Sequence, residues 1–354
     1  MTGTTPRTAK PRPQNARSLR DFGHLRPTKR TLILGGAALG GAILVAAGLC
    51  VYTWGGPAAS RLHLKDIPFD GARAYEYLKQ LCALGPRPSG SPGMQAQQKL
   101  LVEHFTRLGG KVELQRFSGR DPRDDSQVPM ANLIVRWHPQ SKERILLCAH
   151  YDTLPLPLRD PRDPRGRFVG ANDGASGVAV LMALGDEMPK LEPHYGVDFV
   201  LFDGEEFIFD ENRDPYFQGS EHFARQYVEE PPPYRYRWGV LLDMVGDAHL
   251  EIYQERNSMW WEDTRPLVEE IWATARRLGV REFISQKKHE VRDDHLALHN
   301  IAGIPTCDII DFDYPDSRNW AWHTRADTPE RCSALSLAKV GWVVREWLVA
   351  AGRP

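Results

Sequence analysis

Residues 197–206 read VDFVLFDGEE, a short apolar run followed by a turn and two adjacent carboxylates. A run of this length and composition, bounded by a glycine, predicts a buried β-strand. Adjacent side chains in extended backbone point in different directions. One of Glu205 and Glu206 can therefore bind a metal ion while its neighbour handles a proton.

Other ligand-type side chains lie at or near the ends of further apolar runs. His150 follows RILLCA, Asp243 follows WGVLL, and His323 comes after PTCDIIDF and a loop. Asp173 lies in the loop VGANDGASG, where glycines permit tight turns and a following helix N-terminus favours a carboxylate. Each residue taken alone is more often a capping or surface residue. Their recurrence at the carboxyl edge of a predicted α/β sheet favours a joint site with the mixed oxygen and nitrogen ligands of catalytic zinc.

Helical and strand patterns alternate along the chain from residue 71. This order predicts a mixed α/β fold with a mostly parallel central sheet flanked by helices on both faces. The predicted strands are 112–117, 133–137, 145–148, 197–202, 239–242, 250–253 and 306–310. The predicted helices are 72–84, 92–108, 177–188, 220–228, 264–278, 294–301 and 336–350. Loops at 154–170, 209–218, 230–237 and 255–262 are expected to form the walls of a pocket.

The N-terminal region has a different character. Residues 1–30 are basic and proline-rich, which predicts a disordered tail. Residues 31–54 carry no charge and are long enough for one transmembrane helix, although a cleaved signal peptide is the rival interpretation. The positive-inside rule places the tail in the cytoplasm. A linker at 55–70 and a catalytic domain at 71–354 would then be periplasmic, lumenal or extracellular.

Composition limits the possible partners. The chain has 45 basic and 46 acidic residues, so its net charge does not point to nucleic acid. The predicted anchor would contact the lipid bilayer, and the GxxxG spacing of Gly36 and Gly40 is a weak indication of self-association. The cysteines show no metal spacing and no disulfide framework; they are Cys50, Cys82, Cys148, Cys307 and Cys332.

Several segments resemble the zinc aminopeptidases of M28 type. They are CAHYDT, GANDGASGVAVLMALG, VLFDGEEF, GSEHFA, LLDMVGD and WHTRADT, and the resemblance covers residues 71–348. Within that superfamily the chain is more similar to the glutaminyl-peptide cyclotransferases, or glutaminyl cyclases. Two features carry this closer likeness: RDDHLAL before GIPTCDII, and Trp322 directly before His323.

The resemblance implies roles for individual residues. One zinc would be held by Asp173, Glu206 and His323. Glu205 would be the general acid/base, and Trp322 would form an apolar wall for the substrate, with core packing as the alternative role of this tryptophan.

Three more residues complete the implied site. Asp243 and Asp293 would form a hydrogen-bonded pair beside the zinc. His150 corresponds to a residue of the kind that binds a second metal in the aminopeptidases.

The implied reaction converts the N-terminal glutamine of a peptide to pyroglutamate and releases ammonia. An aminopeptidase with two zinc ions, acting on peptides with a free N-terminus, is the main alternative, and a noncatalytic ectodomain is the second. The chain departs from the cyclase pattern at Glu211, Arg292 and Arg318, where the cyclases have tryptophan, glutamine and an aromatic residue. The metal and proton chemistry is therefore better supported than specificity for glutamine.

Overall fold

The computed structural model describes residues 60–353. The predicted basic tail at 1–30, the membrane anchor at 31–54 and its Gly36 and Gly40 lie outside this range. Within residues 60–353, no helix has both the length and the apolar character needed to cross a membrane.

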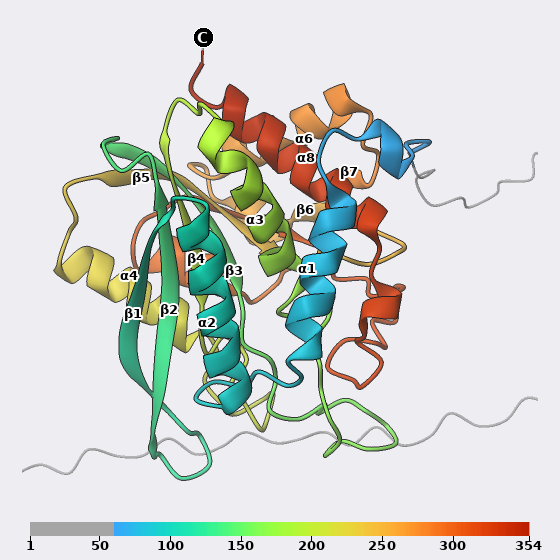
Figure 1. The fold of residues 1–354 in the computed structure, drawn as a ribbon. Coiled ribbons are helices and arrows are strands. Elements are labelled where there is room, and N and C mark those ends of the chain that lie inside the picture. Colours follow the sequence, from blue (N-terminus) through green and yellow to red (C-terminus); the bar gives the residue numbers. More distant parts are fainter. Residues whose placement is uncertain (1–59, 354) are drawn as a thin grey trace, which may run out of the picture. The chain divides into compact units, whose positions relative to one another are not determined.

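A six-stranded sheet forms the centre of the fold, in the order β1, β2, β4, β3, β5 and β8 (Figure 1). The strands are β1 Lys111–Arg120, β2 Gln127–Trp137, β3 Glu143–His150, β4 Gly196–Phe202, β5 Arg235–Asp243 and β8 Thr306–Ile310. β2 pairs antiparallel with both β1 and β4, whereas β4, β3, β5 and β8 pair in parallel. The predicted mixed, mostly parallel sheet is confirmed.

The middle strands owe their position to their apolar sequences. Every residue of β4 is buried, and every residue of β3 after Glu143. Strands of this kind are typical of parallel sheets covered on both faces. Alternate side chains of β3 enter different layers, since Leu147 lies in the larger core and Cys148 in the smaller one.

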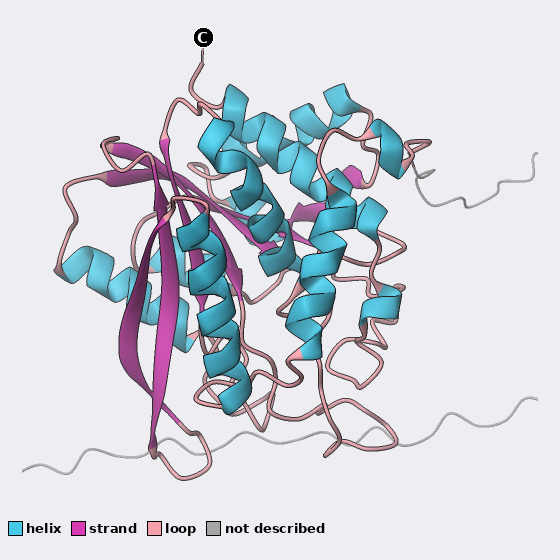
Figure 2. Ribbon diagram, in the orientation of Figure 1, coloured by secondary structure: helices cyan, strands magenta, loops and turns pink. Residues whose placement is uncertain are grey.

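Helices cover both faces of this sheet (Figure 2). The larger core is built with α1 Gly71–Ala83, α2 Pro92–Arg107, α3 Ser176–Glu187, α6 Arg265–Leu278 and α8 Ala334–Ala350. Of these, α1, α3 and α8 lie side by side (Figure 1). On the other face, α4 Gln218–Glu229 and α7 Asp294–Asn300 contribute Phe223 and Leu298 to the smaller core.

A second, small sheet was not predicted. It pairs β6 Ile252–Glu255 in parallel with β7 Phe283–Lys288, and α5 Arg256–Trp260 follows β6. The predicted strand at 250–253 belongs to this small sheet. β7 reads FISQKK and is largely exposed, so it lacks the apolar run that reveals a strand. α5 falls in a segment that was predicted to be a loop, because five residues are too few to show a helical period.

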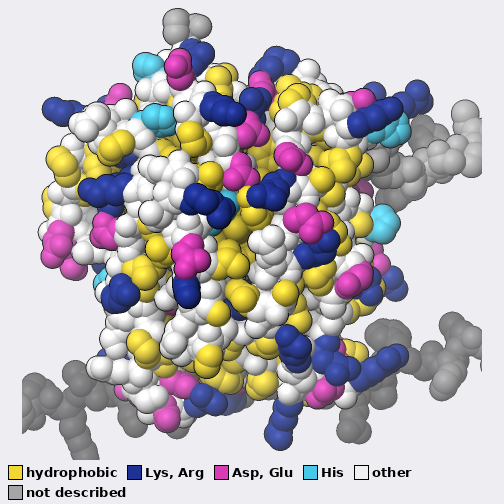
Figure 3. All heavy atoms as spheres, viewed as in Figure 1, with side chains coloured by type: hydrophobic (Ala, Val, Ile, Leu, Met, Phe, Trp, Pro, Cys, Tyr) yellow, Lys and Arg dark blue, Asp and Glu magenta, His cyan; other side chains and the backbone are white. Residues whose placement is uncertain are grey.

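The surface carries mixed charge, and the described cysteines are unpaired. Acidic and basic side chains are interspersed over the face shown in Figure 3, in keeping with the balanced charge of the chain. The cysteines of the described part are buried and form no disulfide; they are Cys82, Cys148, Cys307 and Cys332.

Candidate metal centre

The turn after β4 presents Glu205 and Glu206 to the carboxyl edge of the sheet. Gly204 has a φ of +71°, which a residue with a side chain rarely adopts. Both oxygens of the Asp152 carboxylate accept backbone N–H groups, from Glu205 at 3.1 Å and from Glu206 at 3.2 Å. Asp203 is bound on the other side of the turn by the Ser89 hydroxyl at 2.6 Å. The orientation of the two glutamates is therefore set by buried polar contacts.

Glu206 has one oxygen engaged and one free. Its Oε1 accepts the backbone N–H of Leu154 at 2.6 Å. Its Oε2 is buried without a hydrogen-bond partner among the described residues and lies 3.5 Å from His323 Nε2. Buried polar atoms rarely remain unpaired, so a free oxygen in this position calls for a bound partner.

Asp173 is held in the same way. The Asp327 carboxylate accepts the backbone N–H groups of Asn172 at 2.8 Å and Asp173 at 3.1 Å. Asp173 Oδ2 is buried, has no hydrogen-bond partner among the described residues, and lies 3.6 Å from His323 Nε2.

The structure thus brings together the predicted ligand set. Asp173, Glu206 and His323 each offer an atom, and these atoms lie within 4.8 Å of one another. Two carboxylate oxygens and one imidazole nitrogen match the donors of catalytic zinc sites, which keep a fourth position open. The two unpaired buried oxygens show that these residues fit a zinc ion.

A second group of potential ligands shares Asp173. His150 Nε2 lies 3.1 Å from Asp243 Oδ1 and 3.2 Å from Asp173 Oδ1. Burial lowers the pKa of His150, but the nearby carboxylates of Asp243, Asp152 and Asp173 raise it by more. The pKa of His150 therefore lies well above its usual value. His150, Asp173 and Asp243 form a second group whose atoms lie close enough to hold a metal ion.

Glu205 lies beside both groups, with Oε2 3.7 Å from His150 Nδ1. Burial raises the pKa of Glu205 well above its ordinary value, and the charges of Asp293, Asp294 and Glu206 add to the rise, while His150 opposes it. A carboxyl with a raised pKa can exchange a proton near neutral pH.

Asp293 lies at the N-terminus of α7, and its expected hydrogen bond with Asp243 stays a prediction. Asp293 Oδ1 accepts the backbone N–H of Asp294 at 2.6 Å, and its Oδ2 is buried without a partner among the described residues. Asp243 pairs with His150. Burial raises the pKa of Asp293, and the charge of Asp243 raises it further.

Trp322 forms an aromatic wall next to the metal ligands. Its ring lies 3.9 Å from the His323 ring, centroid to centroid, and Phe312 packs edge-on against it at 5.1 Å. A cavity opens beside this wall, and its lining includes Arg159, Glu211, Tyr216, Phe217, Arg292, Phe312 and Trp322.

The three departures from the cyclase pattern have different positions. Arg292 lines the cavity, with its guanidinium 5.8 Å from the Tyr216 ring centroid. Arg318 is exposed and paired with Asp316 at 2.6 Å, and it does not line this cavity. Glu211 accepts a hydrogen bond from His323 Nδ1 at 2.6 Å. Burial raises the pKa of Glu211, but His323 and Arg159 lower it more, to about 2.

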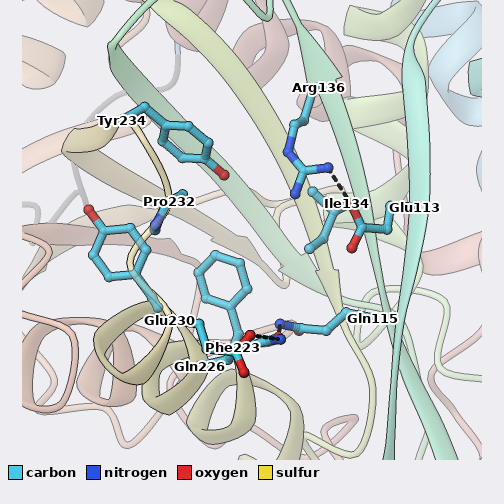
Figure 4. A pocket seen from close by; sticks show the side chains of 10 residues that line it. Glu113, Gln115, Ile134, Arg136, Phe223, Gln226, Glu230, Pro232 and Tyr234 are labelled. Carbon is cyan, nitrogen blue, oxygen red and sulfur yellow. Dashed lines mark hydrogen bonds and ion pairs between the residues drawn. The ribbon is translucent and has the colours of Figure 1, made fainter.

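The pocket drawn in Figure 4 lies elsewhere, between β1, β2 and α4. Arg136 and Glu113, on the paired strands β2 and β1, form an ion pair on one side of it at 2.6 Å. None of the predicted site residues lines it.

Sequence reasoning did not single out Asp152, Asp327 or Glu211. The first two lie inside the segments CAHYDT and WHTRADT, so the resemblance of these segments to the M28 enzymes could have pointed to them. Glu211 was noted only as a departure from the cyclase pattern. All three accept hydrogen bonds from residues that are far away in the sequence. Glu211 and His323, for example, are 112 residues apart.

The fold and the site define a class, the mixed α/β enzymes that use zinc at the carboxyl edge of a parallel sheet. The chain belongs to peptidase family M28, whose family model matches residues 132–348. It is a zinc-dependent enzyme of this family, and its structure is of the glutaminyl cyclase-like kind.

Similar solved structures include enzymes of two kinds, glutaminyl cyclases and an aminopeptidase. A glutaminyl cyclase from Fimbriiglobus ruber is 40% identical, with a TM-score of 0.75, over 83% of this chain and 99% of that chain. A glutaminyl cyclase from Porphyromonas gingivalis is 29% identical, with a TM-score of 0.74, over 80% and 98%. A leucine aminopeptidase precursor from Bacteroides thetaiotaomicron is 28% identical, with a TM-score of 0.74, over 80% and 98%. Because both kinds share this fold, the activity depends on details of the site.

Proposed function

We propose that this protein is a glutaminyl-peptide cyclotransferase with a single zinc ion. The observation that carries the proposal is the packing of Trp322 against His323, 3.9 Å apart by ring centroids, with Phe312 behind it. Cyclisation requires a short side chain to fold back on its own amine, and an apolar wall beside the metal favours that compact shape. The 40% identity to a glutaminyl cyclase over 83% of this chain also supports it.

In this proposal Asp173, Glu206 and His323 hold the zinc. When bound, zinc supplies a Lewis acid that polarises the side-chain amide carbonyl of the substrate glutamine. Trp322 and Phe312 pack against the folded glutamine side chain and keep water away from it.

Glu205 moves the proton. The α-amine nitrogen of the substrate forms a bond to the side-chain amide carbon, and the bond from that carbon to the amide nitrogen breaks. Glu205 takes a proton from the amine and returns it to the departing nitrogen, which leaves as ammonia. The raised pKa of Glu205 suits both halves of this exchange.

In this proposal His150 does not bind metal. Its Nε2 lies 3.2 Å from Asp173 Oδ1 and 3.1 Å from Asp243 Oδ1, so the imidazole interacts with both carboxylates. In this proposal Asp243 and Asp293 support Glu205 through their charges without binding metal.

The test compares two products on the same full-length protein. Ammonia release from a glutaminyl dipeptide is measured beside leucine release from a leucyl amide, together with the zinc content per chain. Ammonia release with one zinc is the expected result. Leucine release with two zincs would overturn the proposal.

A zinc aminopeptidase is the second candidate function, favoured by one specific observation. The group His150, Asp173 and Asp243 and the group Asp173, Glu206 and His323 share Asp173. A carboxylate shared between two groups is the arrangement expected when it bridges two metal ions. The same assay decides between the two, because only the aminopeptidase hydrolyses the leucyl amide.

A further inference from the structure

Glu211 is the acceptor of the second ring nitrogen of His323. The distance from His323 Nδ1 to Glu211 Oε1 is 2.6 Å, short enough for a charge-assisted hydrogen bond. This bond leaves Nε2 as the nitrogen that faces Asp173 and Glu206. A metal-binding histidine commonly donates its other N–H to a carboxylate, which sets its tautomer and makes it a stronger ligand.

Arg159 holds Glu211 in that position. Its Nε lies 2.9 Å from both Glu211 oxygens. Its guanidinium carbon lies 3.9 Å above the Trp322 ring, at a distance typical of a cation–π contact. The backbone N–H of Arg159 also donates to the His323 carbonyl at 3.1 Å.

His323 needs such support because its backbone is in an uncommon conformation. Its φ is +58°, in the left-handed region that residues with side chains seldom occupy. The ring is confined by Trp322 on one side and by Glu211 at Nδ1. Strain of this kind persists only where surrounding contacts impose it.

We propose that Glu211, held by Arg159, is the positioning residue that orients His323 toward zinc and strengthens it as a ligand. This inference rests on the zinc site of the proposed function, and it concerns affinity for the metal. Glu211 replaces a tryptophan of the cyclase pattern, so this chain uses a carboxylate to orient the histidine at a position where that pattern has an apolar ring.

The experiment measures the zinc affinity of the full-length protein by competition with a chromophoric chelator. Glu211→Ala should weaken zinc binding by about 10–100-fold. Glu211→Gln should lie between Glu211→Ala and the unaltered protein, because the amide oxygen accepts the N–H but carries no charge. The matched control is Glu290→Ala, which removes an exposed glutamate from the lining of the same cavity.

Two further readouts separate positioning from general destabilisation. The melting temperature of the zinc-free Glu211 variants should stay near that of the unaltered zinc-free protein. The visible absorption of the cobalt(II)-substituted protein should change in Glu211→Ala and not in Glu290→Ala.

Zinc affinity of Glu211→Ala within twofold of the unaltered protein would overturn the proposal, as would absence of zinc binding by the unaltered protein. A loss of affinity in the variant, together with no ammonia release by the unaltered protein, would refute only the cyclase function.

Discussion

His150 and Asp243 are joined by a hydrogen bond at the ends of two adjacent parallel strands, with 3.1 Å between Nε2 and Oδ1. With Asp173, the same residues form a group that could hold a metal ion. The one-zinc interpretation keeps this hydrogen bond, whereas the two-zinc interpretation replaces it with bonds to a second metal.

The first prediction concerns metal stoichiometry. The unaltered protein should contain one zinc per chain, and His150→Gln should still contain one, because His150 is not a ligand in the proposed site. Elemental analysis of purified full-length protein measures both. Two zincs in the unaltered protein, falling to one in His150→Gln, would contradict the prediction and favour the aminopeptidase.

The second prediction separates the roles of the adjacent glutamates. Glu205→Gln should lower turnover by about 10²–10⁴-fold, the usual contribution of a general acid/base, while the zinc remains bound. Glu206→Gln is the matched control and should lose zinc, because its Oε2 faces His323 Nε2 at 3.5 Å. Loss of zinc from Glu205→Gln with retention in Glu206→Gln would show that the roles are reversed.

The third prediction concerns the aromatic wall. Trp322→Ala should lower kcat/KM for a glutaminyl peptide by about tenfold or more, roughly 1.4 kcal/mol, because the folded side chain loses its apolar contact. Trp320→Ala is the control, since Trp320 is 41% exposed and does not line the cavity beside His323. Equal effects of the two substitutions would mean that Trp322 serves only the packing of its loop.

The fourth prediction concerns stability and pH at a buried ion pair. Lys339 Nζ lies 2.7 Å from Glu282 Oε1, and both side chains are buried. Burial raises the pKa of Glu282, but Lys339 and the backbone N–H of Ser60 lower it more, to below its ordinary 4.5. Because the folded pKa is depressed, the stabilisation is present above about pH 4.5 and is lost as pH falls through the folded value.

Glu282→Gln should therefore lower the free energy of unfolding at neutral pH by about 3–5 kcal/mol, because Lys339 remains buried without a charged partner. Its stability should also fall less steeply below pH 4.5 than that of the unaltered protein. Urea denaturation over a series of pH values measures both effects. Glu221→Gln, which removes an exposed partner of Arg225, should change little, and an equal loss in the two variants would refute the prediction.

Most elements of the fold could be predicted from their own residues. The segments 145–148, 197–202 and 306–310 are mostly apolar, with Asp198 and Asp308 as their charged residues, and all three are strands of the central sheet. β7 could not be predicted, because FISQKK is largely exposed and its pairing with β6 depends on the arrangement of the surrounding chain.

The candidate site also has features that the sequence indicated and features that it did not. The positions after strands and in the glycine-rich loop gave a wider group of candidate ligands, and the resemblance to the M28 enzymes reduced it to Asp173, Glu206 and His323, which the structure brings together. The hydrogen bond between His150 and Asp243 could not be predicted, because it depends on how the ends of two strands are placed side by side.

The sequence by itself determined the α/β fold class and the kinds of ligand at the strand ends, because hydrophobic periodicity and residue type are properties of short, continuous segments. Only the tertiary structure decided which groups hold those ligands in place. Asp152 orients the turn of Glu205, Asp327 holds Asp173, and Glu211 binds His323. These bonds join residues that are 53, 154 and 112 positions apart. No local pattern encodes such contacts, since they form only when packing of the sheet and its helices brings distant loops to one edge.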